Sequence, residues 1–244
     1  YIYIDCFSQT INSPESLSVY LSDRHYGIGG DGIVLICPSK VADAAMKMFN
    51  LDGSEGEMSG NAISCVAKYV HDELGVGKNI ISIETKSGIK HLRLITHDNK
   101  VVSAVVDMGK AEIDPKLIHI NLKGDKIVNK PVKIDGTEYK ITCSSVGNPH
   151  CTMFFENIEM LNLEEIGPKI ENYTKLFPER INVEFVNVID ESTIKMRVWE
   201  RGSGETMSCG TGACAAVVAS VLNGYCQKDK NIRVILPGGD LYVK

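Results

Sequence analysis

The chain has 244 residues, of which 43% are hydrophobic and 23% charged, and its formal net charge is −5. This composition is ordinary for a soluble globular protein, and the length suits two domains of about 120 residues each. The negative charge gives no electrostatic reason to expect nucleic acid, and no basic run or long apolar stretch indicates a membrane. We therefore expect a small-molecule partner, no nucleic acid and no membrane, and we leave a homodimer open.

The eight cysteines form no C-x-x-C pair, and no cluster of cysteine and histidine has zinc-finger spacing. The chain is not a short secreted scaffold, so a disulfide framework is not expected. We predict a reduced, cytoplasmic protein without a metal site. Cys37, Cys65, Cys151 and Cys214 are expected to act as small buried hydrophobes.

The predicted elements alternate between short strands and two helices. A glycine-rich loop at 27–32 precedes a strand, which is the wrong order for a dinucleotide site and indicates a turn. Helices are expected at 60–73 and 210–223, and a domain boundary divides 1–110 from 111–244. Strands are expected at 1–5, 33–36, 46–50, 80–84, 91–96 and 101–108, and then at 118–122, 132–134, 139–146, 150–155, 183–189 and 193–199.

The loops before the two predicted helices resemble each other. In segment 53–60, Glu55 lies four residues before Ser59, which is followed by a glycine and an apolar helix. In segment 203–210, Glu205 lies four residues before Cys209 in the same context. The two copies are 150 residues apart, which indicates a duplicated domain rather than a solenoid.

A helix N-terminus offers unpaired backbone N–H groups and the positive end of the helix dipole, so it binds carboxylates well. A cysteine at this point is expected to have a lowered pKa. If two such loops face each other, both helices can hold one carboxylate while a side chain from each loop flanks the α-carbon. One group then removes a proton from one face and the other returns a proton to the opposite face, which inverts the stereocentre.

The whole chain resembles diaminopimelate epimerase, through segments 23–29, 49–55, 146–150, 180–183, 199–206 and 209–215. The resemblance implies an α/β (α+β) fold of two pseudo-symmetric domains. Each is a curled, mostly antiparallel sheet around a central helix, with the active site in the interdomain cleft. It also implies a cytoplasmic isomerase of lysine biosynthesis that interconverts LL- and meso-diaminopimelate by two-base α-proton transfer, without pyridoxal phosphate, metal or other cofactor.

The same resemblance assigns roles to individual residues. Cys209 matches one catalytic cysteine, and Ser59 stands at the position of the other. Gly60, Asn61, Gly210 and Thr211 match positions that hold the reacting carboxylate, and His150 matches a polar residue near the bases. The full set implied to bind substrate is Asn50, Gly60, Asn61, Asn148, Asn182, Glu200, Arg201, Gly210 and Thr211.

The chain departs from the family pattern at two residues, Ser59 and Ser64. A serine hydroxyl at Ser59 ionises far above neutral pH, and Ser64 stands where the family has an arginine. The resemblance also implies an N-terminal block that would precede Tyr1 and a last strand that would follow Lys244. Ser59 is compatible with three explanations: a substrate-trapping substitution, a natural loss of activity, or one-base chemistry. We favour the first, because the substrate-binding set is intact.

Two other functions remain open on the same fold. One is a racemase of another amino acid, such as histidine, although a substrate with a single carboxylate would not need Arg201. The other is a catalytically silent protein that binds an amino acid, for which Ser59 is the support. A pyridoxal phosphate racemase is not expected, because no phosphate cradle accompanies a Schiff-base lysine.

Overall fold

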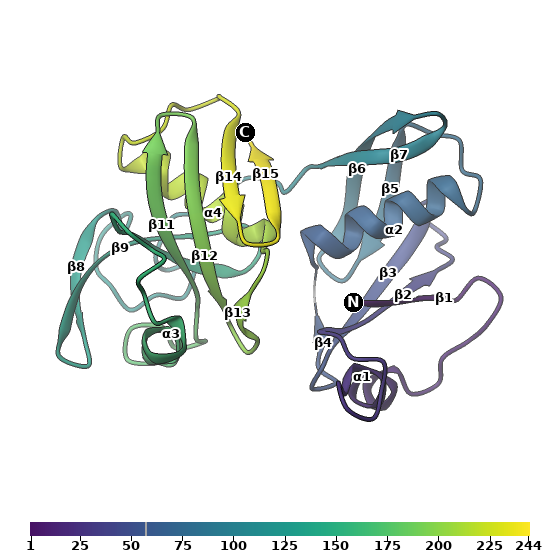
Figure 1. The fold of residues 1–244 in the computed structure, drawn as a ribbon, viewed down its shortest axis with the longest axis horizontal. Helices are drawn as coiled ribbons and strands as arrows, with labels where there is room; N and C mark the ends of the chain where they lie inside the picture. Colours follow the sequence, from purple (N-terminus) through teal and green to yellow (C-terminus); the bar gives the residue numbers. More distant parts are fainter. Residues whose placement is uncertain (57) are drawn as a thin grey trace. The chain divides into compact units, whose positions relative to one another are not determined.

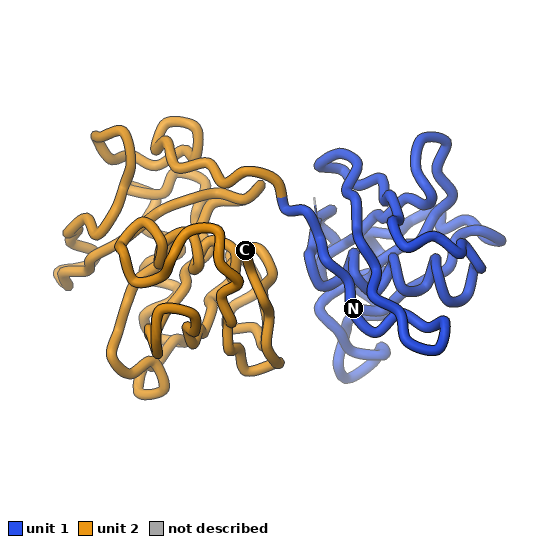
Figure 2. Tube along the Cα trace, turned by 90° about the horizontal axis from the view of Figure 1, so that it is seen from above, with its two compact units in different colours: residues 1–108 blue, residues 109–244 orange. Residues whose placement is uncertain are grey.

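The structure is a computed structural model that describes residues 1–56 and 58–244. The chain divides into two compact units, unit 1 at Tyr1–Met108 and unit 2 at Gly109–Lys244 (Figure 2). Each unit contains one curled sheet with its own hydrophobic core (Figure 1). The predicted α/β class with two curled, mostly antiparallel sheets is therefore confirmed. Among the described residues, no helix is both long and apolar enough to cross a membrane.

Unit 1 contains a seven-stranded sheet in the order β1-β2-β3-β5-β6-β7, with β4 paired to β3. Two of its strand pairs, β1/β2 and β3/β5, are parallel, and the others are antiparallel. The elements are β1 (Ile2–Asp5), α1 (Pro14–Ser22), β2 (Gly32–Cys37), β3 (Ala44–Asn50), β4 (Glu55–Gly56), α2 (Gly60–Asp72), β5 (Ile80–Thr85), β6 (Gly88–His97) and β7 (Lys100–Val106).

Helix α2 packs on the sheet of unit 1 through one apolar stripe. The buried residues Ala62, Ile63, Val66, Ala67 and Val70 recur at helical spacing and join the core with strands β2, β3, β5 and β6. The adjacent Cys65 lies off this stripe and is exposed, so its predicted burial is wrong. Cys151 is buried as predicted, whereas Cys37 and Cys214 are only partly buried.

Unit 2 contains an eight-stranded sheet in the order β15-β14-β12-β11-β10-β9-β8, with β13 paired to β12. The pairs β10/β11 and β12/β14 are parallel. The elements are β8 (Lys130–Ile134), β9 (Thr137–Ser145), β10 (Pro149–Phe154), α3 (Leu163–Glu171), β11 (Asn182–Asp190), β12 (Thr193–Glu200), β13 (Gly204–Thr206), α4 (Gly210–Leu222), β14 (Ile232–Leu236) and β15 (Gly239–Val243).

Helix α4 is the central helix of unit 2. It contacts strands β9, β10, β11, β12, β14 and β15. Most of its faces are buried, and the buried positions carry small residues such as Ala213, Ala215, Ala216 and Ala219. A helix that is apolar all round belongs inside a sheet that curls over it. This position holds the first turn of α4, and therefore Cys209, at a fixed place relative to β10, β11 and β12.

The strand predicted at 118–122 is wrong. Ile118 and Ile120 are buried, but the chain forms a turn there, with Ile118 N–H bonded to the Asp114 carbonyl and His119 at a φ of +56°. The sequence prediction also missed α1, α3, β14, β15 and the two short strands β4 and β13. Both predicted helices are confirmed as α2 and α4.

Candidate functional site

Helices α2 and α4 begin in the same way. Ser59 precedes α2 with φ −134° and ψ 124°, and its Oγ accepts a hydrogen bond from the Ala62 N–H at 3.3 Å. Cys209 precedes α4 with φ −136° and ψ 114°, and its Sγ accepts from the Gly212 N–H at 3.3 Å. Residues 59 and 209 are therefore equivalent N-caps, each at the positive end of a 13-residue helix.

The repeat extends to the strands before each cap. In unit 1, Phe49 of β3 lies opposite Glu55 of β4, and in unit 2, Trp199 of β12 lies opposite Glu205 of β13. Each glutamate thus lies on a short return strand that leads to the cap. At these described positions, the likeness of the two segments that was predicted from sequence spacing is also a likeness of strand pairing and cap conformation.

The candidate residues of unit 1 lie at the end of β3 and the start of α2. Asn50 ends β3, and its Nδ2 donates to Ser54 Oγ at 3.0 Å within the turn that leads to β4. Gly60 and Asn61 are the first two residues of α2, directly after Ser59. Ser64 Oγ donates to the Gly60 carbonyl at 2.9 Å, so this short side chain bonds to its own helix instead of reaching outward as an arginine would.

A buried hydrogen-bonded chain in unit 2 includes two of the candidate residues. His150 on β10 lies 2.6 Å from Glu184 Oε1 through Nδ1 and 2.9 Å from Asn148 Oδ1 through Nε2. The side chains of His150 and Glu184 are both 0% exposed. Both ring nitrogens of His150 therefore take part in hydrogen bonds, one with Glu184 and the other with Asn148.

Sequence reasoning missed Glu184. It lies in β11 between the buried residues Val183 and Phe185, and a charged residue inside such an apolar strand was the available signal. Its second oxygen, Oε2, has no hydrogen-bond partner among the described residues. Burial raises the pKa of this carboxyl, and the neighbouring His150 opposes that shift.

A second set of contacts joins β11 to the turn after β12. Asn182 Nδ2 donates to the Pro149 carbonyl at 2.9 Å, and Asn182 Oδ1 accepts from the Arg201 N–H at 2.9 Å. Asn182 also lies opposite His150 in the parallel β10/β11 pair. Glu200, at the end of β12, accepts a short hydrogen bond from Thr206 Oγ1. These contacts bring Asn148, His150, Asn182 and Arg201 to one end of the sheet of unit 2.

The environment of Cys209 differs from the sequence expectation. Cys209 is only 6% exposed, and burial raises the pKa of its thiol; the negative charges of Glu200 and Glu184 act in the same direction. Hydrogen bonds from Thr211 and the Gly212 N–H lower the pKa but do not outweigh burial. The expected depression of the pKa at the helix N-terminus is therefore wrong: the pKa of the Cys209 thiol is raised, so the protonated thiol is favoured at neutral pH.

Gly212 lets the carboxylate and the thiol approach the same turn of α4. A Cβ at this position would lie 3.0 Å from Glu184 Oε1 and 3.2 Å from Cys209 Sγ. Glu184 Oε1 and Cys209 Sγ therefore both lie next to the space that a side chain at residue 212 would fill. A larger residue would displace one of them.

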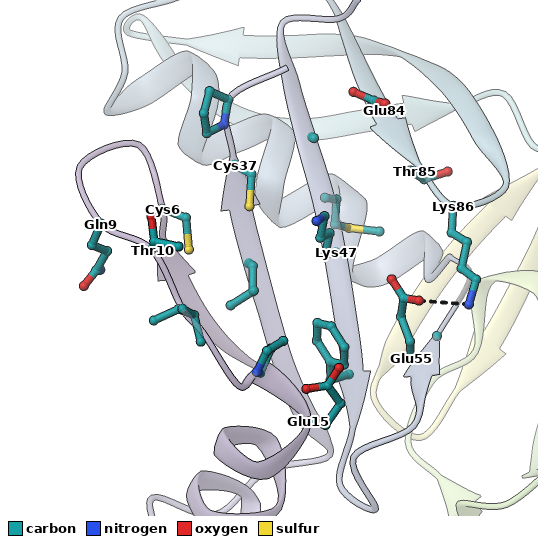
Figure 3. Close-up of a pocket in the computed structure, with 18 residues that line it drawn as sticks. Cys6, Gln9, Thr10, Glu15, Cys37, Lys47, Glu55, Glu84, Thr85 and Lys86 are labelled. Atoms are coloured by element: carbon teal, nitrogen blue, oxygen red, sulfur yellow. Dashed lines mark hydrogen bonds and ion pairs between the residues drawn. The ribbon is translucent and has the colours of Figure 1, made fainter. Parts of the chain in front are cut away.

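One cavity of unit 1 is lined by residues other than the candidate residues. It has a volume of about 690 Å³, lies beside α1, and is bordered by Cys6, Cys37 and Lys47 (Figure 3). Glu55 and Lys86, both in the lining of the cavity, form an ion pair of 2.9 Å. None of the candidate residues lines it. The chemistry of the chain is therefore better sought at the starts of α2 and α4 than in this hollow.

Sequence comparison identifies the family. The family model described as diaminopimelate epimerase matches residues 1–113 and 142–244. The diaminopimelate epimerase of Acetivibrio thermocellus is 52% identical over all 244 residues of this chain, which cover 86% of the relative, and that of Methanococcus maripaludis strain C5 is 49% identical with 87% covered. The chain belongs to the diaminopimelate epimerase family. It is accordingly an isomerase of the epimerase type.

Solved structures with the same fold are more distant in sequence. A probable proline racemase from Agrobacterium radiobacter aligns with a TM-score of 0.68 at 14% identity, covering 98% of this chain and 79% of the other. A hydroxyproline epimerase from Agrobacterium vitis aligns with a TM-score of 0.65 at 13% identity, covering 97% and 78%. At these identities the likeness shows the fold alone.

Proposed function

We propose that this member of the family acts on diaminopimelate. It would interconvert the LL and meso forms without pyridoxal phosphate, by removing the α-proton from one face and returning a proton to the other. Cys209 would be one acid–base group, and Ser59 would stand in place of the second. The observation that carries this proposal is the matched pair of N-caps, Ser59 on α2 and Cys209 on α4.

The surroundings of Cys209 support the role of proton donor. Its thiol is protonated at rest because burial and Glu200 raise its pKa. The backbone N–H groups at the start of α4, including those of Gly210 and Thr211, offer a site for the reacting carboxylate, and the helix dipole stabilises negative charge that develops there. The start of α2 offers the equivalent groups at Gly60 and Asn61.

The polar set of unit 2 supports a second carboxylate on the substrate. Arg201, Asn182 and Asn148 lie at one end of the sheet: Asn182 bonds to the Arg201 N–H and to the Pro149 carbonyl, and Asn148 bonds to His150. A guanidinium pairs with a carboxylate through two parallel hydrogen bonds. The family resemblance implies that Asn50 of unit 1 also binds the substrate. A diamino dicarboxylate can bind to all of these groups, whereas an amino acid with one carboxylate offers no second carboxylate to pair with Arg201.

Ser59 limits the reaction. Its hydroxyl is already used as a cap for Ala62 N–H, and no neighbouring base activates it in the contacts described. We therefore infer an impaired or substrate-trapping form. A catalytically silent amino-acid-binding protein is the second candidate, and it is favoured by the serine at residue 59, whose hydroxyl has no activating base beside it among the described contacts.

Exchange of the substrate α-proton in heavy water tests these proposals. Ser59→Cys should raise the rate of epimerisation by about a hundredfold or more, because a positioned acid–base group contributes about 10²–10⁴-fold. Ser59→Ala is the matched control: it should leave the rate of the unaltered protein unchanged while destabilising the cap by about 0.5–2 kcal/mol.

The outcomes separate the hypotheses. Equal epimerisation by the unaltered protein and Ser59→Cys would show that residue 59 is not an acid–base group. Binding of diaminopimelate without turnover by Ser59→Cys would favour the silent protein or a role for Ser64. Preference for histidine in a competition assay would replace the substrate assignment.

A further inference from the structure

Helix α3 holds the side chain of Trp199 from two positions on one face. Gly167 and Glu171 are four residues apart on this helix and therefore share a face. A Cβ at Gly167 would lie 2.5 and 2.7 Å from atoms of the Trp199 ring, so the ring rests directly on the helix backbone. Trp199 Nε1 donates to Glu171 Oε2 at 2.7 Å. The indole thus lies against α3 and is hydrogen-bonded to its last residue.

The other oxygen of Glu171 binds two further groups. Oε1 accepts a hydrogen bond from the backbone N–H of Gly202 at 2.9 Å and forms a short ion pair with the guanidinium of Arg180. The Glu171 side chain is only 5% exposed. A carboxylate at this depth is stable because several donors compensate for its lost hydration. Glu171 therefore joins α3, the segment before β11 and the turn after β12.

The turn after β12 carries Arg201. The Arg201 N–H donates to Asn182 Oδ1, and the Gly202 N–H next to it donates to Glu171. Gly202 has a φ of +84°, a conformation that side chains rarely adopt. Arg201 Nη1 donates to the Glu179 carbonyl at 2.9 Å. The consecutive amides of Arg201 and Gly202 are therefore held by the side chains of Asn182 and Glu171. The direction in which the Arg201 side chain leaves the turn depends on both hydrogen bonds.

We propose that Glu171 is a positioning residue for substrate recognition: by holding the Gly202 amide, it fixes the turn that presents Arg201 to the distal carboxylate of an amino-dicarboxylate substrate. This inference rests on the proposed function. Glu171 itself touches no substrate. It acts by preventing the turn from sampling other directions, so that less conformational entropy is lost when the substrate binds. Its loss should affect recognition of the distal carboxylate and leave the reacting end unaffected.

Calorimetric titration with meso-diaminopimelate and L-lysine tests this role, because lysine lacks the distal carboxylate. Glu171→Leu removes the acceptor for Gly202, and we expect it to weaken diaminopimelate binding by about tenfold while lysine binding changes by less than about twofold. Trp199→Phe is the matched control: it keeps the ring on Gly167 and the Gly202 bond, and should preserve the preference for diaminopimelate over lysine.

Hydrogen exchange of the Gly202 amide in the unaltered protein gives a second test that does not depend on a variant folding. We expect protection comparable to that of amides within β12, and exchange at the rate of an exposed turn would overturn the proposal. An unchanged preference for diaminopimelate in Glu171→Leu would also overturn it, with the proposed function intact. If the unaltered protein bound neither ligand, the proposed function and the role of Glu171 in recognition would both be refuted.

Discussion

Replacing Gly167 by alanine should destabilise unit 2, although alanine is the better helix former. In an isolated helix the exchange would stabilise by about 1 kcal/mol. Here the new methyl group would lie 2.5 and 2.7 Å from ring atoms of Trp199, whereas carbon atoms normally approach to about 3.5–4.0 Å. The ring must move by about 1 Å, and overpacking of this kind costs about 1–3 kcal/mol. Because movement also strains the bond to Glu171, we expect a net loss of about 1–2 kcal/mol.

Urea unfolding followed by fluorescence measures this loss directly, because Trp199 is the single tryptophan of the chain and reports on unit 2. Glu164→Ala, at an exposed position of the same helix, is the control and should change stability by less than about 0.5 kcal/mol. If Gly167→Ala were as stable as the unaltered protein, the ring would not rest on α3 as described. The support of Trp199 and of the Arg201 turn would then need another explanation.

Two further predictions concern ionisable groups. Iodoacetamide at neutral pH should label the exposed Cys65 before Cys209. Labelling of Cys209 should rise with pH, because burial raises the pKa of its thiol and the thiolate is the reactive form. Mass spectrometry of the labelled peptides checks this, and faster labelling of Cys209 than of Cys65 at neutral pH would contradict it. Hydrogen bonds from Lys68, His71 and the Val101 N–H hold the pKa of Asp72 well below its usual range, so this carboxylate stabilises unit 1 at neutral pH and the stabilisation is lost as the pH falls. Asp72→Asn should therefore lower the melting temperature at pH 7, with a difference that shrinks below about pH 4, and equal melting temperatures at pH 7 would refute the role of Asp72.

Local patterns predicted the parts of the fold that local forces determine. Helices α2 and α4 each follow a glycine-containing loop and have apolar residues at helical spacing, and both form as expected. The strand at 118–122 failed although Ile118 and Ile120 are buried, because burial alone does not supply a strand partner. Helix α3 was missed because Gly167 and Pro168 disfavour a helix, and the need for glycine arises only from contact with Trp199.

The part of the candidate site that the sequence predicted is the part that occurs in both halves of the chain. Ser59 and Cys209 could be paired from spacing alone, and the structure gives them the same backbone conformation. Glu184 and Glu171 were missed because their partners, His150 and Trp199, lie 34 and 28 residues away along the chain. The direction of the Cys209 pKa shift was also missed, because it depends mainly on burial, which a sequence motif does not encode, and on how close Glu200 lies in space.

The shared cap geometry has a consequence for how this protein can change over evolutionary time. At residues 59 and 209 a hydroxyl and a thiol satisfy the same backbone amide three residues on, at the same distance. Selection for a folded chain therefore barely distinguishes serine from cysteine at either position. If the two capping side chains are the acid–base groups proposed above, exchange of this one atom changes the reactivity of the site while the surrounding architecture persists.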